Sequence, residues 1–550
     1  MATLNFKGKT FVQNHHLLVK YHQLIPQKDK SITKKVSLSD NLIIHGDNLK
    51  ALKALLPMYG GKIKCIYIDP PYNTGNEKWV YNDNVNSPMM QDWLGKVVDK
   101  EDLTRHDKWL CMMMPRLKLL HELLAEDGVI FISIDDNEHQ HLRMLMDEIF
   151  SGHFVGEFIW RKKEGGGQTD DYFVTEHEYI LVYAKSDSFK WIDELIPADE
   201  AKYNKEDENG KFFAVKLAKW GTGARKEDRP KMHFPIVAPD GTKILPIAPD
   251  GRDGRWRVGK IRMDLLIEKE LIHWEKKNGR WIPYEKIYYQ EGATKRIKER
   301  SILFDIANTG DAANMLTQIF GKKDVFENPK PYEIIRFFIE HTTDKNSIIL
   351  DSFSGSAPTA HAVLDLNKED NGNRRFILVQ CDEFNKETSK IDDICDKITA
   401  ERVRRVIKGI KNAKDEKLKQ GIDGQFSYFE LGEPIEMESI LGGKNMPTYN
   451  ELARYVFYTA TGEEFDEKAI DEENNFIGES KEYLVYLIYK LDIEYLKSTA
   501  LTLERAKKLV PYKNKKRLVF APSKYLDQDH LDELRIDFAQ LPFEIYKLAK

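Results

Sequence analysis

The sequence predicts an α/β protein whose mostly parallel sheet is formed by two separate stretches of the chain. Short apolar runs alternate with helical patterns in residues 41–190, and the same alternation returns in residues 311–400. Strands that alternate with helices of roughly 10 to 20 residues are typical of doubly wound sheets. The segment between them loses helical periodicity and is rich in Trp, Tyr, Gly and Pro. We therefore expect a β-containing insert at residues 191–310.

The first half of the predicted sheet follows residues 1–40, a polar segment without periodicity that indicates an N-terminal extension. Apolar strand-forming residues end at Gly46, and leucines at helical spacing come next. The apolar run at 63–68 continues directly into Asp69. The elements expected here are a strand at 41–47, a helix at 48–57 ended by Pro57, a strand at 63–68, a helix at 106–126, a strand at 129–134 and a helix at 137–150 capped by Asp135-Asp136.

The insert and the second half are predicted from turn signals and from renewed periodicity. Ala-Pro-Asp-Gly occurs at 238–241 and again at 248–251, and Asn278-Gly279 adds a third turn, so we expect hairpins. The charged and mixed residues 401–550 predict an α+β C-terminal domain. The second half should contain a helix at 332–341, a strand at 347–350, a helix at 359–366 and a strand at 375–380.

Charge is unevenly distributed along this chain. The net charge is −5, yet residues 201–300 carry about 24 Lys and Arg against about 15 Asp and Glu. A basic region on an acidic protein can present a face to nucleic acid. The alternative is a solvated surface with uneven charge.

Cysteine usage and hydropathy indicate the compartment. The four cysteines form no Cys-x-x-Cys pair, so we expect neither a disulfide framework nor a metal site. No run of about 18 apolar residues occurs, and the polar N-terminus lacks the apolar core of a signal peptide. These features favour a cytoplasmic protein without a membrane span.

The motif Asp69-Pro70-Pro71-Tyr72 is the sharpest chemical signal in the sequence. The prolines fix an extended backbone and remove two donors, so a carboxylate and a carbonyl can both point outward as acceptors. Tyr72 offers a flat face. Two acceptors beside a stacking ring suit an amino-bearing base held outside its helix. The alternative is a rigid loop that caps the sheet.

A second signal is Asp351-x-Phe353-x-Gly355, which follows a predicted strand. A glycine in a strand-to-helix turn lets the backbone approach a ligand closely. One glycine is a weak dinucleotide signal, and Gly8-Lys9-Thr10 lacks the earlier glycine of a Walker loop. We therefore expect a cofactor that an apolar wall and a turn hold, rather than a triphosphate.

These residues resemble a known family. Asp-Pro-Pro-Tyr is the catalytic motif of amino-methyltransferases that modify adenine or cytosine in DNA, and DSFSGSAPTAHAV (351–363) resembles their S-adenosylmethionine loop. The catalytic motif precedes the cofactor loop, as in the permuted beta group, where the insert is the target recognition domain. IIHGDNLKALKAL, DPPYNTGNE, HEYILVYAKS, FENPKP and RRFILVQ are similar to the modification subunit of type III restriction–modification systems. The resemblance implies a Rossmann-like methyltransferase sheet in permuted order.

The resemblance also implies roles for particular residues. The family loop reads Gly-Ser-Gly-Thr-Thr, whereas this chain has Ala357 and Pro358 at the third and fourth positions. Gln380 is the first choice for the ribose hydroxyls and Asp382 the second. The implied catalytic residues are Asp69, Pro70, Pro71 and Tyr72; the cofactor residues are Asp47, Lys330, Asp351, Phe353, Gly355, Ser356, Thr359, Gln380 and Asp382; and the DNA contacts are Arg161, Lys162, Lys163, Arg252, Arg255 and Arg257.

The expected activity is methyl transfer from S-adenosylmethionine to N6 of adenine in duplex DNA, after the base has flipped out. Tyr72 would stack on the base, while the Asp69 carboxylate and the Pro70 carbonyl accept hydrogen bonds from its amino group. Methylation of cytosine N4 is the first alternative, because it uses the same acceptors. Methylation of a glutamine side chain or of RNA is a weaker one. A catalytically silent DNA-recognition subunit is the alternative from another class.

The resemblance implies partners as well as DNA. Modification subunits of this family form homodimers, in which one copy reads DNA while the other methylates, and they bind a helicase–nuclease restriction subunit. Part of residues 401–550 should contact such a partner. A helix-rich amphipathic surface at 483–491 (YLVYLIYKL) is the first candidate, and buried core is the alternative for this run.

Overall fold

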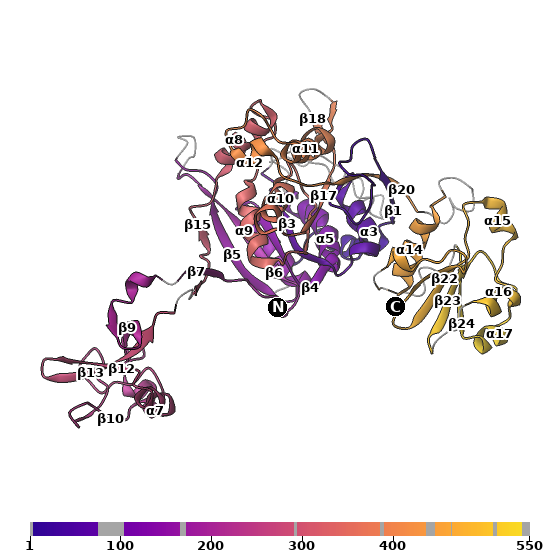
Figure 1. The fold of residues 1–550 in the computed structure, drawn as a ribbon. Coiled ribbons are helices and arrows are strands. Elements are labelled where there is room, and N and C mark those ends of the chain that lie inside the picture. The colour runs from indigo at the N-terminus through magenta and orange to yellow at the C-terminus, as the bar shows by residue number, and fades with distance from the viewer. Residues whose placement is uncertain are drawn as a thin grey trace. The chain divides into compact units, whose positions relative to one another are not determined.

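The computed structural model describes residues 4–541, apart from 75–103, 166–171, 198, 291–293, 386–389, 436–445, 462, 464 and 510–513. The chain divides into two units (Figure 1). The body comprises residues 1–192 and 300–550, and the insert domain comprises residues 193–299. Among the described residues, no helix has the length and apolar character that crossing a membrane requires.

The body is built on a ten-stranded sheet with the order β1-β20-β2-β17-β16-β3-β4-β6-β5-β15. Neighbouring strands from β20 to β4 run parallel. Two strands from the second half of the sequence, β16 and β17, lie between β2 and β3, so the predicted α/β sheet in permuted order is confirmed. The bounds are β1 His22–Pro26, β2 Leu42–His45, β3 Ile63–Ile68, β4 Leu124–Ile134, β5 Phe154–Arg161, β6 His177–Ala184, β15 Ile302–Leu303, β16 Ile348–Asp351, β17 Arg375–Gln380 and β20 Ser427–Pro434.

Helices cover both faces of this sheet. Alternate residues of a strand point to opposite faces, and in β3 Ile66 and Ile68 belong to one buried cluster while Cys65 and Tyr67 belong to another. Strands buried on both faces are apolar almost throughout, which explains their continuous apolar runs. The first cluster includes α3 Asn48–Tyr59, α5 Arg105–Leu123 and α6 His139–Ile149; the second includes α8 Thr309–Phe320, α9 Tyr332–Thr342, α10 Pro358–Asp370 and α11 Glu401–Lys408.

Three predicted element ends differ from the structure. Helix α3 continues past Pro57 to Tyr59, because the ring removes only one donor close to the helix end. Helix α5 ends at Leu123, before Asp127-Gly128. Asp135 does not cap α6: its carboxylate accepts from the Asn137 N–H in a turn before the helix, and Glu138 occupies the N-cap position.

The structure corrects the expected role of the chain's ends. Residues 1–40 are not a separate extension, because β1 pairs with β20 at the sheet edge and Leu4, Phe6 and Val12 are buried in the core. The C-terminal region contributes to the same sheet, because β20 pairs in parallel with β2. Short elements here are α1 Lys9–Val12, α2 His15–Leu18, β18 Glu383–Asn385, β19 Lys390–Asp392 and α12 Glu416–Gln420.

The rest of the C-terminal region forms a four-stranded sheet with the order β21-β22-β23-β24. The run 483–491, expected as a helix-rich surface, instead contains the inner strand β22, and its residues 484–489 are buried. The side chains of residues 484–489 therefore fill a core and do not offer a partner surface. The bounds are α14 Tyr449–Thr461, β21 Phe476–Glu479, β22 Tyr483–Leu487, α15 Ile493–Ser498, α16 Leu503–Lys508, β23 Lys516–Ala521, α17 Gln528–Glu533 and β24 Ile536–Gln540.

The insert domain is β-rich and has its own small core around Trp256. Asn278-Gly279 forms the tight turn between β12 and β13, where both residues have positive φ, so the predicted hairpin is confirmed. Its expected C-terminal boundary moves from 310 to 299, because β15 pairs with β5 in the body. The bounds are β7 Glu194–Pro197, β8 Lys205–Asp207, β9 Gly210–Lys216, β10 Ile236–Val237, β11 Lys243–Ile244, α7 Lys260–Glu268, β12 Ile272–Lys277, β13 Arg280–Tyr288 and β14 Thr294–Ile297.

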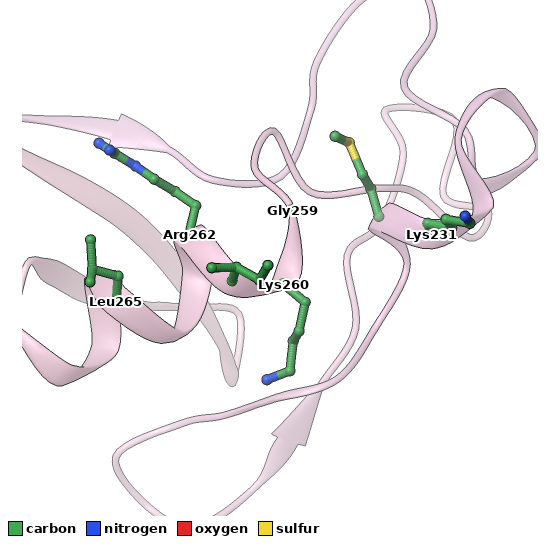
Figure 2. A pocket seen from close by; sticks show the side chains of 7 residues that line it. Lys231, Gly259, Lys260, Arg262 and Leu265 are labelled. Atoms are coloured by element: carbon green, nitrogen blue, oxygen red, sulfur yellow. The ribbon is translucent and has the colours of Figure 1, made fainter.

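A pocket of the insert domain lies at the start of α7 (Figure 2). Lys231, Lys260 and Arg262 place cationic side chains around it, while Ile261 is 89% exposed. Lys260 is paired with Asp264 at 2.5 Å and Arg262 with Glu285 at 3.1 Å. Neighbouring carboxylates therefore offset much of the positive charge at this pocket.

Candidate active site

The two sequence motifs lie at one edge of the body's sheet. Asp69 directly follows β3, and Asp351 ends the neighbouring parallel strand β16. Gln380 ends β17 and His45 ends β2, which are the next strands in the sheet. Carboxyl ends of adjacent parallel strands form the usual ligand-binding edge of open α/β sheets. The fold thus places the Asp-Pro-Pro-Tyr motif beside the glycine-containing turn.

The Asp69 carboxylate is only partly satisfied within the protein. Its Oδ2 atom lies 3.0 Å from Nζ of Lys330, whose side chain is 9% exposed. Its Oδ1 atom is buried and accepts no hydrogen bond within the described part of the chain. Burial raises the pKa of Asp69, and the nearby Lys330 cation opposes that rise. A buried acceptor without a donor is costly, so Oδ1 is poised for a donor from a ligand.

Tyr72 is oriented by a pair of buried charges. Its hydroxyl donates to Oε2 of Glu178 at 3.0 Å, and Lys330 Nζ lies 3.3 Å from the same oxygen. Lys162 Nζ donates to the other oxygen, Oε1, at 3.1 Å. Burial alone would raise the pKa of Glu178, but Lys330 and Lys162 hold it below its ordinary value. Two carboxylates and two ammonium groups therefore form one balanced network around the Tyr72 ring.

Residues of α5 and the Glu138 side chain hold the backbone of the Asp-Pro-Pro-Tyr loop in place. The Pro71 carbonyl accepts from the Trp109 indole N–H at 2.6 Å, and Asn73 donates its amide to Glu138. Glu138 is fully buried and also contacts Nδ1 of His106 at 2.7 Å and of His141 at 2.8 Å. The same three side chains could in principle hold a zinc ion, but two ligand atoms of one tetrahedral zinc lie roughly 3.3 Å apart. The contacts of Glu138 with His106 and His141 are shorter than that, so they are hydrogen bonds that anchor the loop.

Sequence reasoning missed most of these supporting residues. His141 is one of them, since its Nδ1 atom contacts the buried Glu138 carboxylate. Trp109 lies in none of the quoted motifs, and neither Glu138 nor Glu178, which lies in the run HEYILVYAKS, was assigned a role. Their contacts with the Asp69 loop join residues that are distant in the sequence, so no local pattern predicts them. The Glu138–His141 pair is the exception, because residues three positions apart are neighbours on a helix.

The turn after β16 is tightly built around Asp351. Its carboxylate accepts from the Thr359 hydroxyl at 2.5 Å and from the Phe353 N–H at 3.1 Å. Burial raises the pKa of Asp351 to about 7. At Gly355, which has φ +46°, an added Cβ would lie 2.9 Å from the Phe326 ring. The turn therefore requires glycine here, which keeps its backbone close to the strand ends.

Some of the predicted cofactor residues are bonded within the protein, and one of them is exposed. Both ends of the Gln380 amide are hydrogen-bonded: Oε1 accepts from the Gly355 N–H at 2.7 Å, and Nε2 donates to the Cys381 carbonyl at 3.0 Å. Ser356 is likewise held, with its carbonyl 3.1 Å from Arg402. Asp47 caps α3 by accepting from the Lys50 N–H. Asp382, by contrast, is exposed and lies 2.8 Å from His45 Nε2.

The departure from the family loop has a visible cost. Ala357 has φ 63° and is fully buried, so an L-residue occupies a left-handed position that costs about 1–2 kcal/mol. We expect Ala357→Gly to raise the melting temperature and to tighten S-adenosylmethionine binding up to about five-fold, which calorimetry measures. Ala360→Gly, inside α10, is the matched control and should destabilise the protein by about 1 kcal/mol. Equal or weaker binding in Ala357→Gly would contradict the strain argument.

The predicted DNA-binding residues have different surroundings. Lys162 belongs to the Glu178 network, whereas Arg161 donates to the Phe304 carbonyl at 3.2 Å and Lys163 is exposed. In the insert domain, Arg252 and Arg257 are exposed. Arg255 is half-buried and donates to the Gly223 and Trp256 carbonyls, so it holds the loops of the insert domain together.

Fold and site together define a class: an α/β enzyme with an acid, two prolines and a tyrosine beside a cofactor turn. A family described as DNA methylase matches residues 63–391, and the chain belongs to this family. It is a DNA methyltransferase that uses S-adenosylmethionine, and the predicted resemblance to type III modification subunits is confirmed.

Three relatives illustrate the similarity. The type III restriction-modification enzyme EcoPI Mod subunit of Escherichia phage P1 is 33% identical over 476 residues, which are 80% of this chain and 73% of the relative. The StyLTI Mod subunit of Salmonella typhimurium is 31% identical, and the match covers 74% of this chain and 63% of the relative. The type II methyltransferase M.KpnI of Klebsiella pneumoniae is 35% identical, and the match covers 64% of this chain and 82% of the relative. A solved structure, the cytosine-N4-specific PvuII DNA methyltransferase, matches with 12% identity and a TM-score of 0.33, covering 68% of this chain and 95% of that one.

Proposed function

We propose that this chain methylates N6 of adenine in duplex DNA and acts as the modification and recognition subunit of a type III restriction–modification system. The observation that carries the chemistry is the buried Oδ1 atom of Asp69, which accepts no hydrogen bond from the described residues and follows the strand next to the cofactor turn. An exocyclic amino group supplies the donor that this oxygen lacks. The Mod subunits among the relatives support the type III assignment.

The residues of the chain then act by position and charge. Tyr72 stacks on the flipped base, and its hydroxyl stays fixed on Glu178. Asp69 Oδ1 and the Pro70 carbonyl each accept one amino N–H, which localises the nitrogen lone pair away from the ring. S-adenosylmethionine supplies the electrophilic methyl group. When bound, the cofactor would give its methyl group directly to the amino nitrogen and leave as S-adenosylhomocysteine, without a covalent enzyme intermediate. The surplus amino proton would pass to the Asp69 carboxylate that already accepts it, and from there to water. Preorganised acceptors in a buried site account for the acceleration.

The residues around the turn fit the cofactor. The turn at Gly355 keeps the backbone near the strand ends, and Asp382 offers an exposed carboxylate just beyond β17. Because the Gln380 amide is already bound at both ends, we place the ribose hydroxyls on Asp382, the second choice from sequence. Lys330 contacts Asp69 and so belongs with the target base rather than with the cofactor.

Transfer of labelled methyl groups to DNA, followed by nucleoside mass spectrometry, tests the proposed base. We expect N6-methyladenine. N4-methylcytosine as the product would replace adenine with the first alternative. Binding of DNA without any product, at saturating S-adenosylmethionine, would instead identify a silent recognition subunit. Mapping of methylated positions in the host genome then gives the recognition sequence and the strand pattern.

DNA contacts are proposed in both units. In the insert domain, Arg257 is exposed and suited to a phosphate, whereas Arg255 is structural. Arg252 is exposed as well, but its guanidinium group is paired with Asp250 at 2.9 Å, so a phosphate would have to compete with that carboxylate. In the body, Lys163 is exposed beside the site. Gly165-Gly166-Gly167 follows shortly after it in the sequence, and Gly166 and Gly167 lie outside the described residues.

We further propose that the enzyme is a homodimer that binds a helicase–nuclease restriction subunit, as the resemblance of the sequence to type III modification subunits implies. Light scattering at several concentrations, with specific DNA present, should give twice the 64.0 kDa chain mass. A monomer at micromolar protein would contradict the dimer. The helicase–nuclease subunit is tested separately, by co-purification of this chain from the host with a protein of that class.

A further inference from the structure

Lys330 contacts the Asp-Pro-Pro-Tyr motif directly. It precedes α9, its side chain is 9% exposed, and its ammonium group lies 3.0 Å from Asp69 and 3.3 Å from Glu178. The same group lies 4.9 Å from the centroid of the Tyr72 ring. One buried cation therefore contacts the catalytic acid, its neighbouring carboxylate and the stacking ring.

The two oxygens of Asp69 have different surroundings. Lys330 takes Oδ2, while Oδ1 is buried and accepts nothing within the described residues. A free carboxylate could rotate and offer either oxygen, but a buried ammonium on one oxygen fixes the plane of the group. We propose that Lys330 is a positioning residue for methyl transfer, which holds Asp69 as an anion and leaves Oδ1 as the oxygen that receives the target amino group.

Glu178 completes the arrangement from the opposite side. It is 8% exposed, and it fixes Lys330 and the Tyr72 hydroxyl through the same oxygen, Oε2. Lys162 on Oε1 balances its charge. Without Glu178, Lys330 would face Asp69 alone and the ring would lose its hydroxyl anchor. Glu178 thus sets the position of the cation and of the stacking surface together.

Charge determines the sign of each expected effect. The titratable and charged groups around Asp69 are Lys330 from the segment before α9, Glu178 from β6 with Lys162 from the residue after β5, Tyr72, Tyr67 from β3 and Asp351 from β16. Burial raises the pKa of Asp69, Lys330 lowers it and Glu178 raises it. Because Lys330 occupies Oδ2, a proton taken up by Asp69 sits on Oδ1 and turns that acceptor into a donor, so methyl transfer is lost as pH falls through this pKa.

The first test is the pH dependence of single-turnover methyl transfer by Lys330→Met. Removing a cation about 3 Å away should move the acid limb to higher pH by about 1 to 3 units. Lys330→Arg keeps the cation, so its acid limb should stay near that of the wild type while its rate falls. Lys368→Met is the matched control, because Lys368 donates to the Gly421 carbonyl instead of a carboxylate, and its profile should not change.

The second test uses Glu178→Gln, for which the expected shift has the opposite sign. Loss of the like charge should lower the pKa of Asp69 and move the acid limb to lower pH. If Lys330→Met does not fold, Lys330→Arg and Glu178→Gln still decide the question. The proposal fails if the acid limb of Glu178→Gln stays in place or rises. It also fails if Lys330→Met weakens S-adenosylmethionine binding in calorimetry and leaves its acid limb unchanged, since Lys330 would then serve the cofactor.

This inference rests on methyl transfer to a DNA amino group and is independent of which base is modified. The pH profiles are measured on whichever methylated nucleoside forms. A product other than N6-methyladenine would therefore overturn the proposed base while leaving the test of Lys330 intact.

Discussion

Replacing Asp69 with alanine should lower the single-turnover rate of methyl transfer at least about 100- to 1,000-fold, the loss typical for removal of one preorganised group at a reacting centre. The fold should persist, because Lys330 keeps its second partner, Glu178, at 3.3 Å. DNA and S-adenosylmethionine binding, measured by anisotropy and calorimetry, should stay within a few-fold of the wild type.

Asp69→Asn is the matched variant for this prediction. The amide retains an acceptor oxygen and loses the charge, so it should keep more activity than alanine at every pH. Near-normal turnover in Asp69→Ala would show that another acceptor holds the amino group. Equal losses in alanine and asparagine would show that the charge, and not the acceptor alone, is essential.

Removing the insert domain should abolish sequence-specific DNA binding. Specific sites bind proteins typically about 10³- to 10⁷-fold more tightly than other DNA, and this ratio should fall to about 1. Strands β7 and β14 pair as Glu194↔Ile297, so the ends of the insert domain are adjacent and a short Gly-Ser linker can replace residues 194–297. The insert domain has its own core, so the body should retain its fold and its S-adenosylmethionine binding.

Competition between specific and random duplexes, at several salt concentrations, measures this ratio. Exchange of residues 194–297 for the corresponding segment of a relative with another recognition sequence is the stronger control, because it should transfer that sequence preference. Unchanged specificity in the deletion variant would place DNA recognition in the body.

The sequence alone determined the architecture and the chemical centre. Continuous apolar runs ending in Asp69 and in Asp351 predicted two strands, and adjacent parallel strands necessarily bring such ends to one edge. Two prolines restrict the backbone locally, so the sequence also predicted an extended conformation for the Asp-Pro-Pro-Tyr loop. Asn278-Gly279 is a local signal of the same kind, and the structure confirms the hairpin that it predicted.

The tertiary structure decided what surrounds that centre. From the sequence we expected residues 1–40 and 401–550 to lie outside the sheet, but strand pairing adds β1 and β20 to it. It also turned the apolar run at 483–491 into an inner strand, because burial depends on neighbours that local periodicity does not record. Lys330 carries no sign in the sequence of its contact with Asp69. Ion pairs and hydrogen bonds between distant residues depend on how the chain folds back, so the charges that tune Asp69 emerge only when the strands are assembled.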